Sequence, residues 1–208
     1  MHIPIFLQTF KESKNLKYCL LRLKELKIKY KIFYSFNGKL KKNHSLINKI
    51  YNSTKARSRI GREMSSSEIA CAYGHIKIYE YIVKKKIKNS VIIEDDAFIS
   101  KNLIKIIQKK INIIKKYDVV ALSATSGFVY KKNKNFKYVE FCDFETHCNG
   151  TGGYIINLQT CKKILNENKG KVCTVPDWPL NFKKNKIKSG LLLPFNIVLI
   201  NQNFSHLG

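Results

Sequence analysis

The sequence has few acidic residues, few arginines and no long apolar segment. Its 208 residues contain 39 Lys+Arg against 14 Asp+Glu, a formal net charge of +25, and only four of the basic residues are arginine. No window reaches the roughly 18–20 consecutive apolar residues that a membrane span requires. The best window, residues 191–200, is interrupted by Pro194. We therefore expect no membrane-spanning segment.

Signals for secretion and for a zinc centre are also absent from the sequence. No basic segment precedes the apolar start of the chain and no small-residue cleavage site follows it, which favours a cytoplasmic location. The six cysteines contain no CxxC pair and no zinc-ligand spacing. We expect them to be reduced and buried.

The scarcity of arginine bears on how the positive charge is interpreted. Proteins that bind nucleic acids favour Arg because its planar guanidinium makes bidentate contacts. Here Lys accompanies abundant Asn and Ile, as an AT-rich genome would produce on solvated surfaces. Two functional alternatives stay open. One is binding to nucleic-acid phosphates, and the other is peripheral contact with an anionic membrane surface at the inner membrane face through residues 84–86 and 183–184.

Three of the four arginines, Arg57, Arg59 and Arg62, lie close together. Because the chain uses Lys almost everywhere else, this cluster indicates an anion site, and we expect Arg59 to contact a phosphate-bearing ligand. An exposed turn before a helix is the alternative explanation.

The composition predicts one packed domain over residues 1–208. Hydrophobic residues make up 44% of the chain and aromatic residues 12%, which supplies enough apolar side chain for one core. A chain disordered throughout is excluded, because large apolar residues recur from residue 3 to residue 200. Neither an internal repeat nor a flexible linker is visible.

Strand and helix patterns alternate along the chain. Apolar runs predict strands at residues 3–7, 30–36, 90–93 and 118–122. Helical spacing predicts helices over residues 16–26, 65–82, 101–115 and 159–167, with Ser13 as the cap of the first. Less regular segments predict a basic hairpin at residues 128–142 and a loop feeding a strand at residues 150–158. This order predicts an α/β fold with a mostly parallel central sheet flanked by helices.

Three consecutive carboxylates, Glu94, Asp95 and Asp96, follow the clearest buried strand. Open parallel sheets bind ligands beyond the carboxyl ends of their strands. Adjacent carboxylates repel one another unless a cation lies among them, and Mg²⁺ or Mn²⁺ prefers oxygen ligands together with substrate phosphates. The cluster therefore indicates a divalent metal site. A solvated acidic loop that caps the next helix is the alternative.

Several segments resemble glycosyltransferase family 25. SSSEIACAYGHIKIYEYI at residues 65–82, followed by VIIEDD at 91–96, is similar to the family's Leu-Ser-x-x-Glu-x-x-Cys-x-x-Ser-His helix and its Leu-Glu-Asp-Asp strand end. Residues 36–38, HCNGTGGYIIN at 147–157 and Pro176-Asp177 match further family segments. The family includes bacterial lipopolysaccharide and lipooligosaccharide galactosyltransferases and is related to the collagen galactosyltransferases.

The resemblance implies a GT-A-like, Rossmann-like fold and inverting transfer of a hexose, with galactose favoured. The implied donor is a UDP-sugar and the implied acceptor a glycolipid or oligosaccharide. It also implies a Mn²⁺ or Mg²⁺ site, which we assign to Glu94 and Asp96, with Asp95 accepting hydrogen bonds from the ribose. Which of the three carboxylates bind the metal stays open at this point.

Other positions follow from the same resemblance. Asp177, between Pro176 and Pro179, is our choice for the base that deprotonates the acceptor hydroxyl, with a helix-capping role as the alternative. His206 is a candidate third metal ligand. Thr9 and Gly153 are assigned to donor contacts, because a glycine permits close approach of a ligand to the backbone.

Glu68 and His75 lie seven residues apart on the helix predicted over residues 65–82. This spacing places both on one face, and we expect a buried, hydrogen-bonded pair that supports the donor pocket. Two solvated helix-surface residues are the alternative.

Two other functions compete with the transferase. A nucleic-acid-binding protein would exploit the charge, but it leaves the acidic cluster unexplained and shows no accompanying motif. A metal-dependent nuclease or phosphoesterase would use the same cluster and needs further ligands, for which only Asp118, Asp143 and Glu145 are available.

Overall fold

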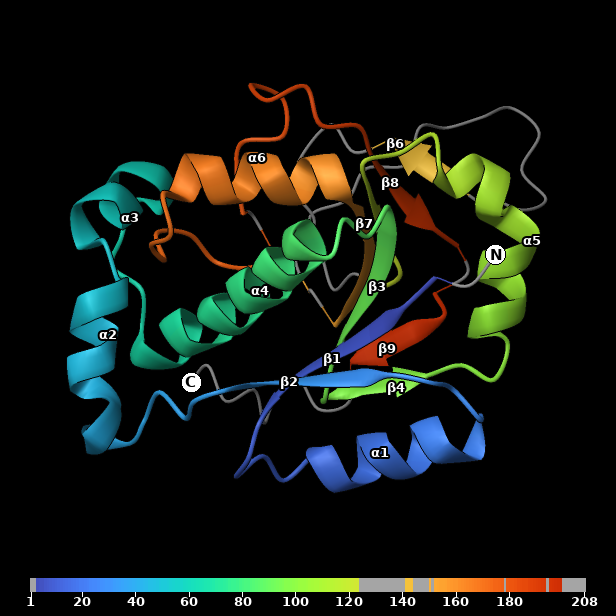
Figure 1. Cartoon of the computed structure of the whole chain (residues 1–208), viewed down its shortest axis with the longest axis horizontal. Coiled ribbons are helices and arrows are strands. Elements are labelled where there is room, and N and C mark those ends of the chain that lie inside the picture. The colour runs from blue at the N-terminus through green and yellow to red at the C-terminus, as the bar shows by residue number, and fades with distance from the viewer. Residues whose placement is uncertain are drawn as a thin grey trace.

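A seven-stranded sheet forms the centre of the molecule (Figure 1). The computed structural model describes residues 3–123, 141–143, 150, 152–177, 179–193 and 195–199. The strands of the sheet are β1 (Ile5–Phe10), β2 (Lys31–Ser35), β3 (Asn89–Glu94), β5 (Val119–Ala121), β6 (Phe141–Asp143), β7 (Gly153–Asn157) and β8 (Ser189–Leu192). A separate two-stranded ribbon pairs β4 (Ala97–Ile99) with β9 (Ile197–Leu199). The helices in these ranges are α1 (Leu16–Glu25), α2 (His44–Ile50), α3 (Ser53–Ile60), α4 (Ser66–Lys84), α5 (Leu103–Ile114) and α6 (Leu158–Asn168), with a short 3₁₀ helix at Lys41–Asn43.

Most strands of the sheet point the same way. The strand order is β2-β1-β3-β7-β5-β8-β6, and the pairs β1–β2, β1–β3 and β5–β8 are parallel. Only β7 and β6 run against the rest of this sheet, β7 between β3 and β5 and β6 at the edge beside β8. The predicted α/β fold with a mostly parallel sheet flanked by helices is confirmed, and the reversed β7 is a feature that the sequence pattern did not indicate.

Alternating side chains on the strands build a core on each face of the sheet. Leu7 and Ile93 face α1 and α5, whereas Phe6 and Ile92 face α4 and α6. Figure 1 shows α4 and α6 lying next to each other on their side of the sheet, in agreement with their mutual contacts. Burial of each such side chain stabilises the fold by roughly 1.5–3 kcal/mol. The strands are therefore fixed in register, which fixes where each of them ends.

The start of α4 agrees with the helix predicted from residue 65, whereas the residue before α1 differs from the predicted cap. The Ser65 hydroxyl accepts a hydrogen bond from the Glu68 N–H, and the Glu68 carboxylate accepts one from the Ser65 N–H, which completes a capping box. For α1 the prediction that Ser13 is the cap was wrong, since Asn15 occupies that position and its side chain caps nothing. Ser13 instead accepts a hydrogen bond from the Asn15 N–H at 3.3 Å.

The β4–β9 ribbon packs against two glycines at the start of β7. A Cβ on Gly152 would lie 2.3 Å from Leu199 Cδ2, and one on Gly153 would lie 2.2 Å from Ile197 Cδ1. Only glycine leaves room for these side chains. Along the described ranges, none of the helices combines the length and hydropathy needed to cross a bilayer. The basic hairpin predicted at residues 128–142 lies, apart from β6, outside the described residues.

Candidate functional site

The carboxyl ends of β1, β2 and β3 meet at one edge of the sheet and open into a cleft. The cleft has a volume of about 280 Å³. Its walls come from the ends of the three strands, from the turn after β2 and from the first turns of α4. The lining residues include Gln8, Phe10, Ser35, Asn37, Gly38, Ser67, Cys71, Glu94, Asp95 and Asp96. The ligand site predicted beyond the strand ends thus corresponds to a real cleft in the structure.

The turn after β2 is pressed against the start of α4. A Cβ on Gly38 would lie 2.1 Å from the backbone oxygen of Ser66, so no larger residue fits there without moving the helix. The Ser35 hydroxyl donates to the Ala70 carbonyl at 2.5 Å and adds a second tie between β2 and α4. These two contacts hold one wall of the cleft at a fixed distance from the acidic turn.

The acidic turn, Glu94-Asp95-Asp96, joins β3 to β4 at the base of this cleft. Asp95 is buried and accepts a hydrogen bond from the hydroxyl of Thr9. Burial, and then the charges of Glu94 and Asp95, raise the pKa of Asp96 to about 8. Three carboxylates in contact are costly as anions, because each disfavours ionisation of the next.

One atom of the acidic turn shows what would relieve this cost. Oδ1 of Asp96 is buried and has no hydrogen-bond partner. A buried carboxylate oxygen without a partner destabilises the fold, and crowded carboxylate oxygens are the groups that coordinate a divalent cation. The residues present therefore fit a Mg²⁺ or Mn²⁺ ion, and the unpartnered Oδ1 of Asp96 is the clearest candidate ligand atom.

A buried hydrogen-bond chain runs from α4 through β7 to the acidic turn. The hydroxyl oxygens of Tyr79 and Tyr154 lie 2.6 Å apart. The Tyr154 hydroxyl also lies 2.6 Å from Nδ1 of His75, and Nε2 of His75 lies 3.0 Å from Oε1 of Glu94. We call these four residues the tyrosine–histidine relay.

A neutral His75 with its proton on Nε2 satisfies the whole relay. Tyr79 then donates to Tyr154, Tyr154 donates to Nδ1 of His75, and the Nε2–H donates to Glu94. Burial raises the pKa of both tyrosines well above the ordinary value, so both keep their protons at neutral pH. The relay therefore holds Oε1 of Glu94 beside Nε2 of His75 at the base of the cleft.

The expected pair between His75 and Glu68 does not form. Glu68 is held by Arg62, with Nη2 to Oε1 at 2.5 Å, and by the capping box with Ser65. A carboxylate at the third position of a helix is drawn to the free N–H groups at the helix start, which competes with a partner two turns away. His75 is buried as expected, but its partners are Tyr154 and Glu94.

Cys71 adds a further potential metal ligand beside the acidic turn. Ligand atoms of Cys71, His75 and Glu94 all lie within 4.8 Å of one another. Burial, followed by the charges of Glu94 and Asp177, raises the pKa of the Cys71 thiol well above its ordinary value. A thiol must lose its proton to bind a metal, so this set is less suited to a cation at neutral pH than the carboxylate oxygens are.

Asp177 lies at the same end of the sheet as the acidic turn. Its charge acts on Cys71 together with those of Glu94 and Asp96. Its Oδ1 accepts a hydrogen bond from the Gly150 N–H at 3.2 Å. The structure therefore brings Asp177 to the cleft region and orients it through the backbone that leads into β7.

The arginine cluster is engaged elsewhere. Arg59 on α3 donates to Glu167 at 2.6 Å and to Asn168 at 2.7 Å, next to the end of α6. Arg57 and Arg62 pair with Glu63 and Glu68. Each of the three guanidinium groups thus faces a protein carboxylate, and the structure does not bring Arg59 to the cleft.

The remaining assigned residues divide into three cases. Thr9 reaches the site through Asp95 and supports that carboxylate. Gly153 is contacted by Ile197, so the close approach expected of a ligand is made by a side chain of the protein itself. His206 lies outside the described residues. Sequence reasoning missed the relay tyrosines, although Tyr154 stands in the GTGGYIIN segment and Tyr79 in the α4 apolar pattern.

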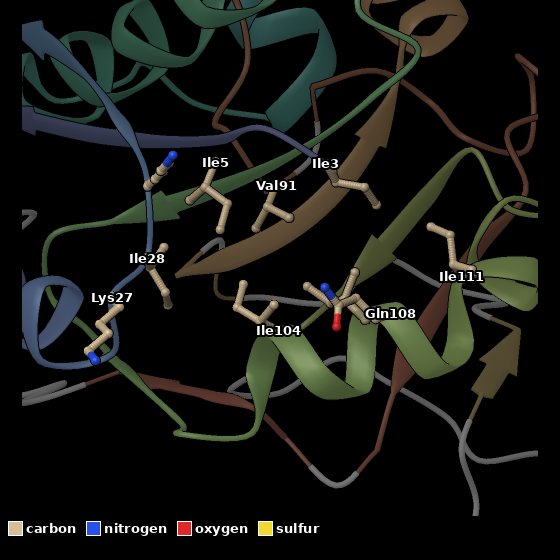
Figure 2. Close-up of a pocket in the computed structure, with 10 residues that line it drawn as sticks. Ile3, Ile5, Lys27, Ile28, Val91, Ile104, Gln108 and Ile111 are labelled. Atoms are coloured by element: carbon tan, nitrogen blue, oxygen red, sulfur yellow. The ribbon is translucent and has the colours of Figure 1, made fainter. Parts of the chain in front are cut away.

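A larger hollow lies at the opposite edge of the sheet, beside the first residues of β1 (Figure 2). It has a volume of about 600 Å³ and is lined mainly by isoleucines, of which Ile104, Ile107 and Ile111 lie on α5. Lys27, Lys29 and Gln108 are the polar residues in its lining, which contains no carboxylate. Nothing there matches the crowded oxygen ligands of the cleft.

Comparison with known proteins adds a family. A sequence model described as glycosyltransferase family 25 (LPS biosynthesis protein) matches residues 2–177. No curated protein matches the chain. Among solved structures, mannose-1-phosphate geranyltransferase from Thermus thermophilus is similar in fold, with a TM-score of 0.52 and 9% identity over 95% of this chain and 75% of that one. Inositol-1-phosphate CTP transferase from T. maritima gives a TM-score of 0.49 and 10% identity over 99% and 92%.

Proposed function

Because the chain belongs to glycosyltransferase family 25, a family of LPS biosynthesis proteins, we propose that it moves a hexose from a UDP-sugar to a lipooligosaccharide or lipopolysaccharide glycan. In this proposal the transfer is metal-dependent and inverts the anomeric carbon, and galactose is the favoured sugar. A glycosyltransferase uses a nucleotide-sugar donor and a glycan acceptor, and the cleft beyond β1, β2 and β3 is where such a donor would lie.

The acidic turn holds the metal and the diphosphate in this proposal. Asp96 supplies a buried oxygen that has no hydrogen-bond partner, and Glu94 supplies a carboxylate that His75 holds in place through Oε1. The chemistry that a divalent cation supplies when bound is neutralisation of the negative charge that develops on the departing UDP. Asp95, which the Thr9 hydroxyl holds in place, accepts a hydrogen bond from the ribose in this proposal.

Asp177 is the proposed catalytic base. An inverting transfer needs a carboxylate that takes the proton from the acceptor hydroxyl as this attacks the face of the sugar opposite the leaving group. The hydrogen bond from the Gly150 N–H orients the Asp177 carboxylate, which takes the proton of the acceptor hydroxyl in this proposal. The negative charges of Asp177 and of the acidic turn both act on the Cys71 thiol, so Asp177 lies near the turn although it belongs to a different segment.

The observation that carries the proposal is the buried Asp96 oxygen without a partner in a cluster of three carboxylates. A solvated acidic loop would expose such an oxygen to water. Of the further ligands considered for the phosphoesterase alternative, Asp118 is bonded to Asn157 and to the Lys188 N–H instead.

Calorimetric titration with UDP tests the proposal. We expect binding in the presence of Mn²⁺, loss of binding with EDTA, and loss in Asp96→Ala. The matched control is Glu80→Gln, which removes an exposed carboxylate of α4 that pairs with Lys77 outside the cleft. Binding of UDP by wild type and Asp96→Ala alike, or binding of DNA or RNA in place of UDP, would contradict the proposal.

A further inference from the structure

Four large apolar side chains form an exposed surface on α1 and on the β4–β9 ribbon. Tyr18 and Leu21 of α1 are 68% and 56% exposed, and Phe98 of β4 and Val198 of β9 are 48% and 56% exposed. Phe98 and Val198 are paired in the ribbon, and Tyr18, Leu21 and Phe98 line one hollow between α1 and β4. These side chains therefore make one continuous surface, which we call the α1–ribbon patch.

The patch is built on a fixed frame. Nε of Arg22 donates to the Ile99 carbonyl at 2.9 Å, and its guanidinium lies over the Phe98 ring at 4.8 Å from the centroid. The same guanidinium pairs with Glu25 at 2.8 Å. Because Arg22 ties α1 to β4, the four apolar side chains keep their relative positions without a partner.

Lysines border the patch along α1. Lys17 and Lys24 are exposed on α1, on either side of Leu21 in the sequence. A second groove, on the other flank of α1, is lined by Lys11, Lys17, Lys24, Lys27 and Lys29 together with Leu16, Leu20 and Leu21. The one acidic residue of α1, Glu25, pairs with Arg22. The surface thus combines apolar tips with a lysine border.

We propose that the α1–ribbon patch docks on the surface of an anionic lipid bilayer. Leucine and phenylalanine side chains enter the boundary between headgroups and acyl chains, and tyrosine places its hydroxyl at the headgroups. Each lysine near such a surface strengthens binding on the order of fivefold. A second copy of the chain is a poor occupant, because two lysine borders would face one another, and a nucleic acid offers no counterpart for the apolar tips.

The position of the patch connects it to the cleft. Residues 11–15 lead from the end of β1 into α1, and Glu12 and Lys14 of this segment line the cleft. In Figure 1, α1 lies beside the ribbon of β4 and β9. The first residues of α1 lie at the same end of the molecule as the last residues of β2. Docking would thus bring the cleft mouth close to the lipid surface. The docking itself stands apart from the transferase reaction, whereas its use in reaching a glycolipid acceptor rests on the proposed function.

Sedimentation with vesicles tests the docking. The full chain is mixed with vesicles of equal parts phosphatidylglycerol and phosphatidylcholine, or of phosphatidylcholine alone. We expect binding to the anionic vesicles, at least about tenfold weaker in Leu21→Ser/Phe98→Ser, since each buried apolar side chain contributes severalfold. Lys17→Gln/Lys24→Gln should weaken it by roughly tenfold or more. The matched controls are Ile113→Ser, an exposed isoleucine on α5, and Lys84→Gln/Lys85→Gln at the end of α4, which should bind as wild type does.

Three results would overturn the docking proposal. The first is equal sedimentation of wild type and Leu21→Ser/Phe98→Ser, and the second is no sedimentation of wild type with the anionic vesicles. The third is a dimer of wild type in analytical ultracentrifugation that Leu21→Ser/Phe98→Ser converts to monomer, since the patch would then be a protein interface. Calorimetry with UDP and Mn²⁺ on the same variants separates the two proposals, because loss of vesicle binding with unchanged UDP binding concerns the patch alone.

Discussion

The two edges of the sheet carry hollows of opposite character. At the carboxyl edge a cleft of about 280 Å³ ends on three carboxylates, one with a buried oxygen that has no partner. At the amino edge a hollow of about 600 Å³ is lined mainly by isoleucines (Figure 2). The larger hollow is lined by apolar side chains, which are stable in a protein interior without a ligand. The smaller one contains crowded carboxylates and a buried oxygen without a hydrogen-bond partner, and groups of this kind are typical of functional sites.

The residues at the amino edge contribute to the stability of the fold, whereas the carboxylates at the carboxyl edge oppose it. Apolar residues at the amino edge contribute to the core, because Ile5, Val91 and Ile107 belong to the cluster between the sheet, α1 and α5. Carboxylates at the other edge repel one another and disfavour the folded chain. Substitutions at the two edges should therefore change different measured quantities.

Asp177→Asn should give the largest effect at the carboxyl edge. Removing the proposed base should lower the transfer rate by about 10²–10⁴-fold, while the amide oxygen keeps the hydrogen bond from the Gly150 N–H. Radiolabelled transfer from UDP-galactose to a lipooligosaccharide acceptor measures the rate, and calorimetry with UDP and Mn²⁺ should be unchanged. Full turnover by this variant would assign the base elsewhere.

Ile107→Ala should give the largest stability loss at the amino edge. Ile107 is buried in the cluster between the sheet and α5, and its truncation costs about 2–4 kcal/mol of unfolding free energy. Urea denaturation measures this loss. UDP binding at a temperature where the variant is folded should match wild type; a loss like that of Asp96→Ala would show that the two edges do not act independently.

Asp96→Asn should stabilise the metal-free chain by about 1–2 kcal/mol, because the amide carries no charge among its acidic neighbours. The raised pKa of Asp96, about 8, sets the pH range. In acid the carboxyl binds its proton in both folded and unfolded chains, so the gain is small. It widens as the pH rises toward 8, since the folded chain resists an ionisation that the unfolded chain allows. Thermal unfolding in EDTA checks this, and an unchanged or lower melting temperature would contradict it.

Tyr154→Phe should give the smallest of these effects. Nδ1 of His75 loses its donor, so Glu94 is less firmly oriented, and we expect UDP binding with Mn²⁺ to weaken by about 5–10-fold, roughly 1 kcal/mol. Tyr81→Phe, on the same helix as His75 with its ring against Phe6 and Phe33, is the control. If both variants and wild type bind UDP with equal affinity, the relay does not position Glu94 for binding.

Sequence patterns predicted most elements and the location of the acidic turn. Apolar runs and helical spacing are local properties, so β3, α4 and α5 were recognised, and a buried strand followed by three carboxylates is a strong local signal. The reversal of β7 was not, because a strand's pattern records which faces are buried and says nothing about the direction of its neighbours.

Pairings between distant residues explain the other errors. Glu68 was matched with His75 by helical spacing, but the helix start and Arg62 compete for the same carboxylate. His75 found its partners on β7 and β3, which no spacing along α4 could indicate. The residues that hold Glu94 were therefore accessible only from the three-dimensional arrangement.

The β4–β9 ribbon has a consequence for the order in which the protein matures. β4 begins directly after the acidic turn, and in the described chain it pairs with β9, at residues 197–199. During translation, β1, β2 and β3 leave the ribosome long before β9 does, so β4, which follows the acidic turn, cannot pair until β9 has been synthesised. A nascent chain is thus expected to form most of its sheet while the carboxylates are still free to move. The acidic turn is therefore expected to reach its final geometry only after residues 197–199 have been synthesised.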